Sequence, residues 1–228
     1  MAKRDIKRTE SIEDFLKTVY KLQRGSSARV RTSAIAEALA ITAPSAVDLI
    51  NRCKEANLID YVSHKGIRLT PAGEKIALEV LRHHRLLELY LVEALGYTWD
   101  EVHDEADRLE HHISEVLEAR ISEFLGHPTT DPHGDPIPSL EGHIPQRGLH
   151  PLADLAPGEV GIVERLLNQE PETLRYMASK GLVLGARVVI HKQEPYDGLT
   201  HITVDEQMQV IGEMTTHFVM VRRVTSDD

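Results

Sequence analysis

The chain has 228 residues, of which 41% are hydrophobic, and a formal net charge of −10. Its single cysteine excludes an internal disulfide framework, and we find neither a secretory signal nor a long apolar run, so we expect a cytoplasmic protein that does not enter a membrane. The acidic balance excludes nucleic-acid binding unless the positive charge is concentrated in one region.

The charge is in fact distributed unevenly. Residues 1–75 contain 14 Lys or Arg against 9 Asp or Glu, a net charge of +5. Residues 76–126 contain 4 against 12, a net charge of −8, and the remainder has a net charge of −7. A basic first segment followed by acidic ones predicts a DNA-facing module joined to parts with a different task.

The first segment has the pattern of a helix-turn-helix. Residues 10–24 place apolar side chains at helical spacing, and a second, short helix is expected to end at Leu39. Pro44 suits the first turn of a third helix, which is expected to reach about Ala56. The sequence therefore predicts two short helices joined by a tight turn, preceded by a longer helix.

A β-hairpin is predicted directly after these helices. Residues 58–62 and 67–70 have the composition of short strands, and the residues between them, His64-Lys65-Gly66, are typical of a turn. A hairpin in this place is the wing of a winged helix. We therefore expect residues 1–75 to form a winged helix-turn-helix DNA-binding domain.

The middle of the chain is predicted to be helical. Residues 71–95 and about 100–125 have amphipathic patterns, so we expect two long helices that also supply a two-fold dimer interface. Residues 126–151 are rich in Pro, Gly and His and predict a surface linker. The expected second domain, residues 76–150, is a helical dimerisation and metal-binding domain.

The last part of the chain predicts a small β-barrel. Short segments of strand composition recur through residues 151–228, with one helix near residues 172–180. The fold class expected for the whole chain is mainly α, with the barrel at its C-terminal end.

The third predicted helix is the candidate DNA-reading element. In a helix-turn-helix the second helix of the motif inserts its N-terminal residues into the major groove, while basic side chains contact phosphates. The residues expected to face the groove are Thr42, Pro44, Ser45 and Asp48. The residues expected to contact phosphates are Arg29, Arg31, Arg52, Lys54, Lys65 and Arg68. A winged helix that serves only protein contacts remains an alternative.

Several histidines and carboxylates recur at helical spacing in the middle segment. Asp107, Glu110 and His111 stand at i, i+3 and i+4, so on a helix they would share one face. His103 and Asp107 are related by i, i+4 in the same way. This pattern predicts a metal site, although solvated charges with incidental histidines would give the same spacing.

An earlier pair repeats the arrangement. His84 and Glu88 are also related by i, i+4, so two packed helices could present both sets to one space, whereas the neighbouring His83 and His112 are expected to face solvent. Nitrogen and oxygen donors without thiolate suit manganese(II), iron(II), cobalt(II) or zinc(II). The donor set narrows the choice of metal without naming it.

The sequence resembles the diphtheria toxin repressor family of metal-dependent transcriptional regulators, which includes iron-responsive and manganese-responsive members. The resemblance covers nearly the whole chain. It is carried by the segments EDFLKTVYKL, LRHHRLLE, VHDEADRLEHHIS, DPHGDPIPSLEG and LADLAPGEVGIV. It implies that the last domain is an SH3-like, FeoA-like barrel.

The resemblance also implies two metal sites. The implied regulatory site consists of Asp14, Asp107, Glu110 and His111. The implied ancillary site consists of His84, Glu88, His103 and Glu170, with Glu172 as an alternative fourth ligand.

The resemblance favours manganese(II) over iron(II). Asp107 stands where iron-sensing members carry a cysteine, and Asp14 stands where they carry a methionine, so hard oxygen replaces both soft ligands. We expect cobalt(II), zinc(II) and cadmium(II) to bind in vitro. Lys17 stands where manganese members with two carboxylates on the first helix carry the second, which argues against a tightly paired dinuclear site.

On the DNA side, Thr42, Pro44 and Ser45 match the start of the family's recognition helix, whereas Asp48 replaces a glutamine and predicts an altered operator. The resemblance implies a homodimer on a palindromic double-stranded operator and repression of metal-homeostasis genes, without enzymatic activity. Two alternatives stay open. The metal could be purely structural, or the same donors could hold a metal-bound water in a metallohydrolase.

Overall fold

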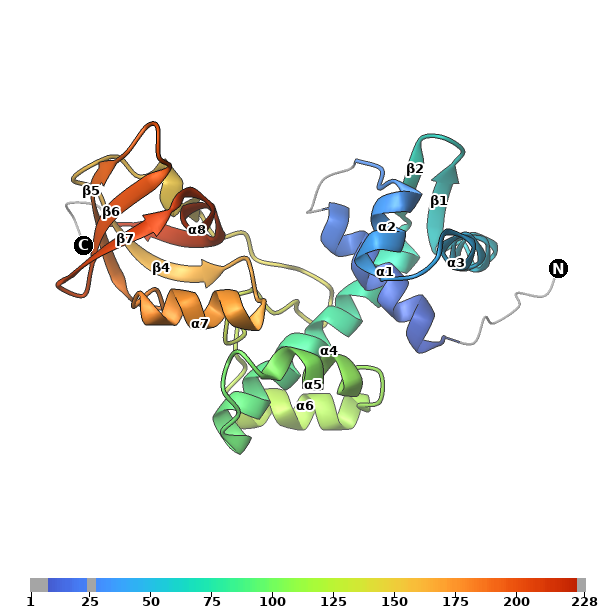
Figure 1. Ribbon diagram of the computed structural model, residues 1–228. Coiled ribbons are helices and arrows are strands. Elements are labelled where there is room, and N and C mark those ends of the chain that lie inside the picture. The colour runs from blue at the N-terminus through green and yellow to red at the C-terminus, as the bar shows by residue number, and fades with distance from the viewer. Residues whose placement is uncertain (1–7, 24–27, 225–228) are drawn as a thin grey trace. The chain divides into compact units, whose positions relative to one another are not determined.

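The computed structural model describes residues 8–23 and 28–224, which form two compact units (Figure 1). The first unit contains the residues up to 84 together with residues 108–118 and 138–143, and the second contains residues 85–107, 119–137 and those from 144 onward. Helices make up 45% and strands 21% of the structure. The prediction of a mainly α chain therefore fits the part before the C-terminal sheet but overstates the helical share of the whole.

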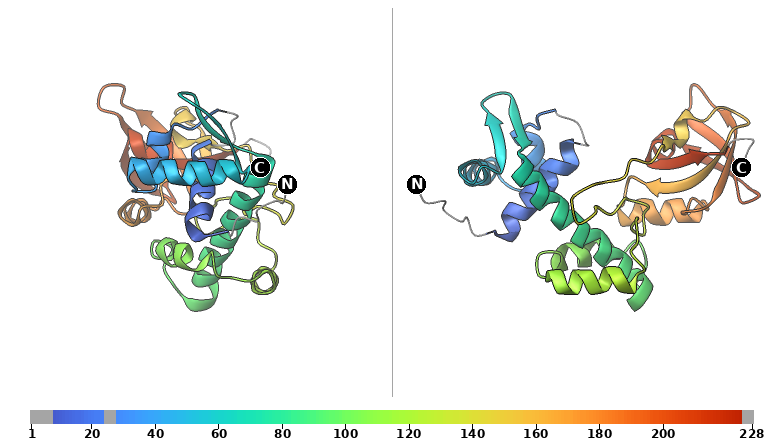
Figure 2. Two further views of the ribbon diagram at one scale, coloured as in Figure 1. Left: turned by 90° about the vertical axis from the view of Figure 1, so that its right-hand side faces the viewer. Right: turned by 180° about the vertical axis from the view of Figure 1, so that it is seen from behind.

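The N-terminal part is a three-helix unit with a hairpin, as predicted. Its elements are α1 (Glu10–Gln23), α2 (Thr32–Ala38), α3 (Ala43–Glu55), β1 (Ile59–Val62) and β2 (Gly66–Leu69). The antiparallel hairpin stands beside α3 in all three ribbon views (Figures 1 and 2). The core buries one apolar face from each element, including Ile12, Phe15, Leu16, Val19, Ile35, Ile50 and Ile67.

The hairpin is anchored to the segment before α2. Val30 exchanges backbone hydrogen bonds with Ile67, at N–O distances of 2.7 and 2.9 Å. Gly66 has a φ of +101°, and a Cβ atom there would lie 2.4 Å from the Val30 carbonyl oxygen. Only glycine meets both conditions at this turn. The wing is consequently fastened by backbone hydrogen bonds to the segment that leads into α2.

The middle segment contains three helices where two were predicted. They are α4 (Pro71–Leu95), α5 (Val102–Leu109) and α6 (Glu115–Phe124). The predicted continuous helix over residues 100–125 is wrong, because residues 110–112 form a turn and residues 113–114 belong to no helix or strand. Ser114 begins α6 by accepting a hydrogen bond from the Leu117 backbone N–H at 3.2 Å, the capping role for which serine is favoured.

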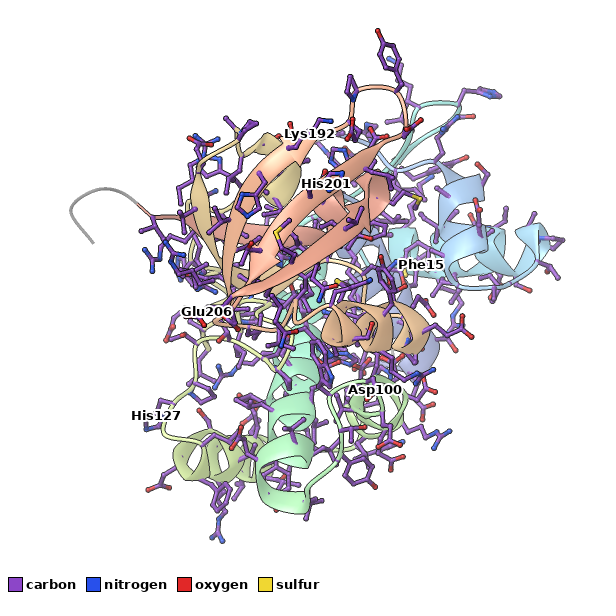
Figure 3. All side chains as sticks on the ribbon, turned by 60° about the vertical axis from the view of Figure 1, so that its left-hand side comes forward. Phe15, Asp100, His127, Lys192, His201 and Glu206 are labelled. Carbon is purple, nitrogen blue, oxygen red and sulfur yellow. The ribbon has the colours of Figure 1, made fainter. Side chains whose placement is uncertain are left out.

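The C-terminal part is an antiparallel sheet in the order β3-β8-β4-β5-β6-β7. Its strands are β3 (His150–Pro151), β4 (Val160–Leu166), β5 (Arg187–Gln193), β6 (Leu199–Val204), β7 (Gln207–Gly212) and β8 (Val219–Arg223). The helices α7 (Pro171–Ser179) and α8 (Glu213–Phe218) accompany it, and α7 is the helix predicted near residues 172–180. Lys192 and His201 are paired on β5 and β6 and mark the exposed face of the sheet (Figure 3).

The segment predicted as a surface linker is partly buried. Asp131, His133 and Ile137 are at most 4% exposed. Gly134 has a φ of +83°, and a Cβ atom there would lie 2.0 Å from the Glu164 carbonyl oxygen of β4. The loop therefore packs its backbone directly against β4, and the prediction of a surface linker is wrong for these residues.

No single described helix is long and apolar enough to cross a membrane, and only α2 and α3, bent by 110° at their junction, pass the length and composition test as a pair.

Truncation of the N-terminal core should destabilise the first unit. Phe15 is fully buried, so Phe15→Ala should lower the free energy of unfolding by about 3–5 kcal/mol. Chemical denaturation followed by circular dichroism measures this. Val47 on α3 is 49% exposed, and Val47→Ala should change the free energy by less than about 0.5 kcal/mol. Equal effects of the two substitutions would contradict the assigned core.

Candidate metal centre and DNA-reading helix

The acidic residues of α1 meet a histidine from the turn after α5. His111 Nδ1 lies 2.7 Å from Glu13 Oε2, and His111 Nε2 lies 3.0 Å from Asp14 Oδ1. An ionised carboxylate can only accept hydrogen bonds, so both ring nitrogens of His111 donate one. The imidazole is therefore held as a cation. The hydrogen bond to Asp14 outweighs the opposing effect of burial and, with that to Glu13, raises the pKa of His111 to about 9.

Glu110, the residue before this histidine, is a buried carboxylate with three nitrogen neighbours. It is 1% exposed. Its Oε1 atom lies 2.5 Å from Lys17 Nζ of α1 and 3.3 Å from His111 Nε2. Its Oε2 atom lies 2.7 Å from His84 Nδ1 of α4. Glu110 thus ties α1 to the first half of α4 through charged contacts.

Asp14, Glu110 and His111 form a donor group that fits a cation. Each offers one ligand atom, and these atoms all lie within 4.8 Å of one another. Two carboxylate oxygens and one imidazole nitrogen are donors that divalent first-row metals accept. Because His111 carries a proton on each nitrogen, a cation bound there has to displace one of them.

The fourth residue of the predicted regulatory site, Asp107, is not part of the group of Asp14, Glu110 and His111, but one of its ligand atoms lies within 4.8 Å of ligand atoms of Glu110 and His84. The prediction treated Asp107, Glu110 and His111 as one helix face, but α5 ends at Leu109 and the last two lie in the following turn. Asp107 is 46% exposed, and its Oδ2 atom lies 3.8 Å from His103 Nε2 on the same helix. The i, i+4 relation of His103 and Asp107 is therefore real, while Asp107 as a regulatory ligand stays a prediction.

His83 corrects another expectation. It is buried, not solvent-facing: its Nδ1 donates to the Glu110 backbone carbonyl at 3.0 Å, and its Nε2 lies 3.2 Å from Glu118 Oε2. Burial opposes the charged imidazole, yet the bond to Glu118 raises the pKa of His83. His83 therefore fixes the backbone of Glu110. His112, in contrast, is 64% exposed, as expected.

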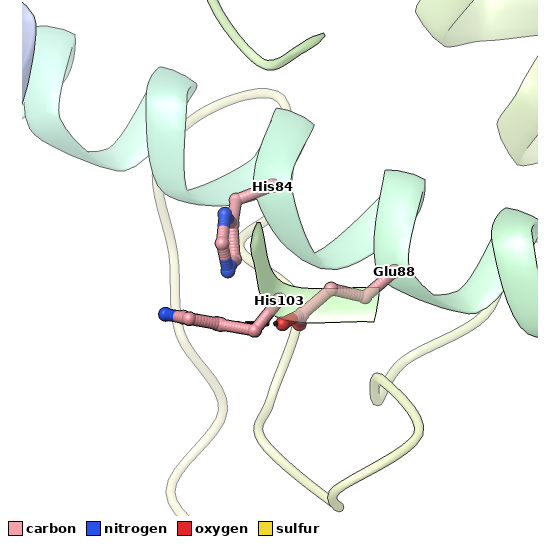
Figure 4. Close-up of side chains that lie close together, drawn as sticks. All are labelled: His84, Glu88 and His103. Carbon is pink, nitrogen blue, oxygen red and sulfur yellow. Dashed lines mark hydrogen bonds and ion pairs between the residues drawn. The ribbon is translucent and has the colours of Figure 1, made fainter. Parts of the chain in front are cut away.

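The predicted ancillary residues gather on α4 and α5. His84 and Glu88 follow one another by one turn of the same continuous helix, and His103 lies beside Glu88 with its Nδ1 3.0 Å from Glu88 Oε1 (Figure 4). One donor atom from each of the three lies within 4.8 Å of the others. Glu170 and Glu172 are exposed at the start of α7, and the donor groups of the described residues include neither.

Sequence reasoning missed a further donor group, formed by Glu88, Asp131 and His133. Their ligand atoms lie within 4.8 Å of one another, and all three side chains are at most 3% exposed. His133 Nε2 lies 2.7 Å from the Trp99 carbonyl oxygen, which can only accept. The proton of a neutral His133 is therefore on Nε2, and the lone pair of Nδ1 points inward, as in a histidine that ligates a metal.

Two buried atoms of this group make no hydrogen bond to another described residue. Within the described residues, Asp131 Oδ2 and His133 Nδ1 have no hydrogen-bond partner. Asp131 Oδ1 accepts from the backbone N–H groups of His133 and Asp135, which aims Oδ2 inward. Burial, followed by the charges of Glu88 and Asp135, raises the pKa of Asp131 well above its usual range. Arg85 Nε, 3.7 Å from Asp131 Oδ2, offsets part of this charge, and a proton or a further cation would offset the rest.

A sequence signal for this group did exist. The motif DPHGDPIP contains both Asp131 and His133, but its high content of Pro and Gly predicts a linker. Glu88 offers its two oxygens to two sides, with Oε1 toward His103 and Oε2 4.0 Å from His133 Nδ1.

The start of α3 has the exposure that a DNA-reading helix needs. Thr42 caps the helix by accepting from the Ser45 backbone N–H at 3.4 Å, and the two hydroxyls lie 2.9 Å apart. Thr42, Pro44, Ser45 and Asp48 are all exposed. Asp48 lies 3.8 Å from Arg52, so part of its charge is offset within the helix.

The predicted phosphate-contacting residues divide into two kinds. Arg31, Lys54, Lys65 and Arg68 are exposed, and Arg52 is half-buried and lies 3.8 Å from Asp48. Arg29 is committed to the wing, because it donates to the Asp60 carbonyl at 2.7 Å and to the Asp60 carboxylate at 2.6 Å. The same carboxylate accepts from Arg68 at 3.1 Å, and the bond from Arg29 lowers the pKa of Asp60. A structural role for Arg29 is thus visible beside its predicted one.

Comparison with known proteins gives matches along almost the whole chain. Residues 7–67 match the iron dependent repressor N-terminal DNA binding domain, residues 70–139 match the iron dependent repressor metal binding and dimerisation domain, and residues 150–223 match the FeoA domain. The iron-dependent repressor IdeR of Mycobacterium tuberculosis is 32% identical over 227 residues, which cover 94% of this chain and 98% of the relative.

The chain belongs to the iron-dependent repressor family. The diphtheria toxin repressor of Corynebacterium efficiens is 30% identical over 226 residues, with coverage of 94% and 96%. A solved manganese-dependent transcriptional repressor in complex with manganese is 36% identical, with a TM-score of 0.86 and coverage of 93% and 100%. As a member of this family the chain is a metal-dependent transcriptional regulator.

In this member of the repressor family, metal-free stability should depend on pH through His111. The pKa of His111 is about 9 in the folded protein and about 6.5 in the unfolded chain, so its stabilising contribution is complete below about 6.5 and is lost as the pH rises through 9. Denaturant titrations in chelator from pH 6.5 to 9.5 should show wild type losing on the order of 1–3 kcal/mol more than His111→Gln. Parallel pH profiles for the two proteins would contradict the pairing.

Proposed function

We propose that the chain is a manganese(II)-activated transcriptional repressor that binds DNA as a homodimer. The observation that carries the proposal is the convergence of Asp14, Glu110 and His111, because Asp14 belongs to α1 and α1 supplies much of the core beneath the DNA-reading helix. Ile12 and Phe15 of the same helix pack in the cluster that holds Ile50 of α3. A cation bound by these donors would therefore fix α1, and with it the pose of α3.

When bound, the metal supplies a positive charge shared by two carboxylates and an imidazole. Neighbouring residues of the chain hold these ligands in position. His83 holds the backbone of Glu110, and Glu13 hydrogen-bonds to the imidazole of His111. If the bound state favours the DNA-competent pose by about 1–3 kcal/mol, operator affinity rises roughly 5- to 150-fold, and DNA raises metal affinity by the same factor.

The donor chemistry supports manganese. The donor groups of the described residues contain carboxylates and imidazoles, which suit the harder divalent metals. The one cysteine, Cys53, is buried in the winged-helix core, where burial raises its pKa to about 12, so it is no thiolate donor. One similar repressor of known structure is manganese-dependent and was solved in complex with manganese. Iron(II) is the second candidate, since the relative from Mycobacterium tuberculosis is called iron-dependent.

A second cation position is proposed around Glu88. His103 lies beside one of its oxygens, and the orphaned atoms of Asp131 and His133 lie toward the other. A cation there would compensate the buried carboxylates without protonating them. We propose this group, with His84, as the ancillary site. Asp107, Glu170 and Glu172 stay candidates for ligands that join when metal binds.

The DNA side of the proposal follows from α3 and the wing. We propose that Thr42, Pro44, Ser45 and Asp48 face the major groove of a palindromic operator, with Arg31, Arg52 and Lys65 near phosphates and Arg29 supporting the wing. In this scheme residues 1–75 read DNA, residues 76–150 bind metal and dimerise, and residues 151–228 form the accessory domain. The protein acts in the cytoplasm and is not an enzyme.

Manganese-dependent operator binding tests the proposal. The probe is the DNA duplex enriched by in vitro selection on the manganese-loaded protein, and the readout is fluorescence anisotropy with manganese(II) or with chelator. Wild type should bind roughly 5- to 150-fold more tightly with manganese. Asp14→Ala should abolish this gain, because the cation loses its ligand on α1. Glu10→Ala on the same helix, at a side chain that is 63% exposed, is the matched control and should keep the gain.

Equal affinity in manganese and in chelator would overturn the gating role. If chelation unfolds the protein in a melting experiment, the metal is structural and the regulatory proposal fails for that reason instead. Hydrolytic turnover abolished by Glu110→Ala would favour a metallohydrolase.

A further inference from the structure

The outward face of α3 presents one continuous stripe of exposed side chains. The face that is buried consists of Ala46, Leu49, Ile50 and Cys53. The opposite face, which we call the outer stripe, consists of Pro44, Val47, Asp48 and Asn51, all exposed. These positions stand at i, i+3, i+4 and i+7, so they follow one line along the helix. The packing of the buried face therefore fixes the direction in which the outer stripe faces.

Val47 is an apolar side chain of the outer stripe that the fold does not use. It is 49% exposed, and the winged-helix core does not contain it. On the base edges of the major groove, the methyl group of thymine is the apolar contact that a protein can make. Val47 therefore suits a thymine, and the ring of Pro44 on the turn before suits the same kind of contact.

Asp48 and Asn51 are the polar members of the outer stripe. The Asp48 side chain is 71% exposed, and Arg52 Nη1 lies 3.8 Å from its Oδ2 atom. Arg52 also donates to Thr9 Oγ1 at 3.4 Å, so it offsets the carboxylate from the side of α1 and leaves it accessible. A carboxylate accepts from the N4 amino group of cytosine, and the amide of an asparagine pairs with N6 and N7 of adenine.

The two hydroxyls at the start of α3 have another task. Thr42 Oγ1 accepts from the Ser45 backbone N–H at 3.4 Å and lies 2.9 Å from Ser45 Oγ. Both residues lie beside the outer stripe, and their hydroxyls suit a phosphate, which carries no sequence information. Discrimination between bases therefore falls mainly to the outer stripe.

We propose that the outer stripe of α3 reads base edges, with Asn51 recognising an adenine, Asp48 a cytosine and Val47 a thymine methyl group. The inference rests on the proposed function, because it names the class of DNA sequence that the same helix takes. It adds Val47 and Asn51 to the DNA-reading residues and assigns a base to Asp48. The outer stripe is about 10 Å long at 1.5 Å per residue, so the three bases lie within about four successive base pairs.

The first test compares the duplexes that wild type and variants select from a random library, in manganese(II) and in chelator. Asn51→Ala should lose the preference for one adenine in each half-site, a discrimination of roughly 5- to 150-fold. Asp48→Asn should convert one cytosine position to adenine, because the new amide pairs with adenine. The control is Glu55→Gln, which alters an exposed acidic residue on the last turn of α3 and should select the wild-type motif.

The second test removes one methyl group from the DNA. Each thymine of the selected half-site is replaced in turn by deoxyuridine, and affinity is measured by fluorescence anisotropy at fixed salt. At one thymine the replacement should weaken wild-type binding roughly two- to fivefold, as expected for one buried methyl group. Val47→Ser should lose this sensitivity. Equal sensitivity of the two proteins at every thymine overturns the role of Val47.

The selected motifs decide the rest of the proposal. If Asn51→Ala and Asp48→Asn fold and select the wild-type motif, the outer stripe does not read bases. If Asn51→Ala does not fold, a duplex with 7-deazaadenine, which lacks the N7 acceptor, tests the same contact with wild-type protein. Binding should then weaken at one adenine, and unchanged binding at every adenine overturns the assignment.

Failure of this inference is distinguishable from failure of the proposed function. A motif that depends on manganese but is unchanged in the variants keeps the proposed function and excludes the outer stripe. A motif that changes with the variants but is selected equally well in chelator keeps the outer stripe and excludes gating by metal. A wild-type protein that selects no motif overturns both.

Discussion

A buried carboxylate has to be compensated, and in this protein Glu110 imposes that requirement on three elements at once. Lys17 comes from α1, His84 from α4 and His111 from the turn after α5, and each places a nitrogen within 3.3 Å of the same carboxylate. Removing any one of them leaves charge in a site that water does not reach. These charged contacts act beside the apolar core around Phe15 in fixing how the elements pack.

The position of this carboxylate explains how a small ion can influence a helix that it does not touch. α1 contributes Asp14 to the donor group on one face and Phe15 and Leu16 to the winged-helix core on the other. Because protein cores are close-packed, a shift of α1 is transmitted to α3 and not absorbed. Metal and DNA are coupled in this account through one helix with two faces.

The sequence predicted the order of elements well and the site only in part. Helical period and turn residues identified α1, α3, the wing and α4 to within a residue or two, since these signals are local. The break between α5 and α6 was missed because Ser114 as a cap is a single-residue signal inside an amphipathic pattern. Because the break is missed, the sequence predicts one helix face for Asp107, Glu110 and His111. In the structure Asp107 lies on α5, whereas Glu110 and His111 lie in the turn that follows it.

The second cluster could not be predicted from spacing. Asp131 and His133 lie more than forty residues after Glu88, and the contact depends on Gly134 approaching the backbone of β4. The burial of His83 against Glu118 is likewise a long-range result, because its sequence neighbours match those of a surface helix. The composition of residues 126–151 correctly indicates a segment rich in turns. Whether such a segment is exposed or buried depends on the elements that pack against it.

A crystal structure of the manganese-loaded protein, with anomalous scattering used to locate the metal, is the most direct measurement of the central claim. The account predicts an ion about 2.0–2.3 Å from oxygens of Asp14 and Glu110 and from a ring nitrogen of His111, with Lys17 still within reach of Glu110. Anomalous density elsewhere only, with Asp14 turned to solvent and unliganded, would contradict it.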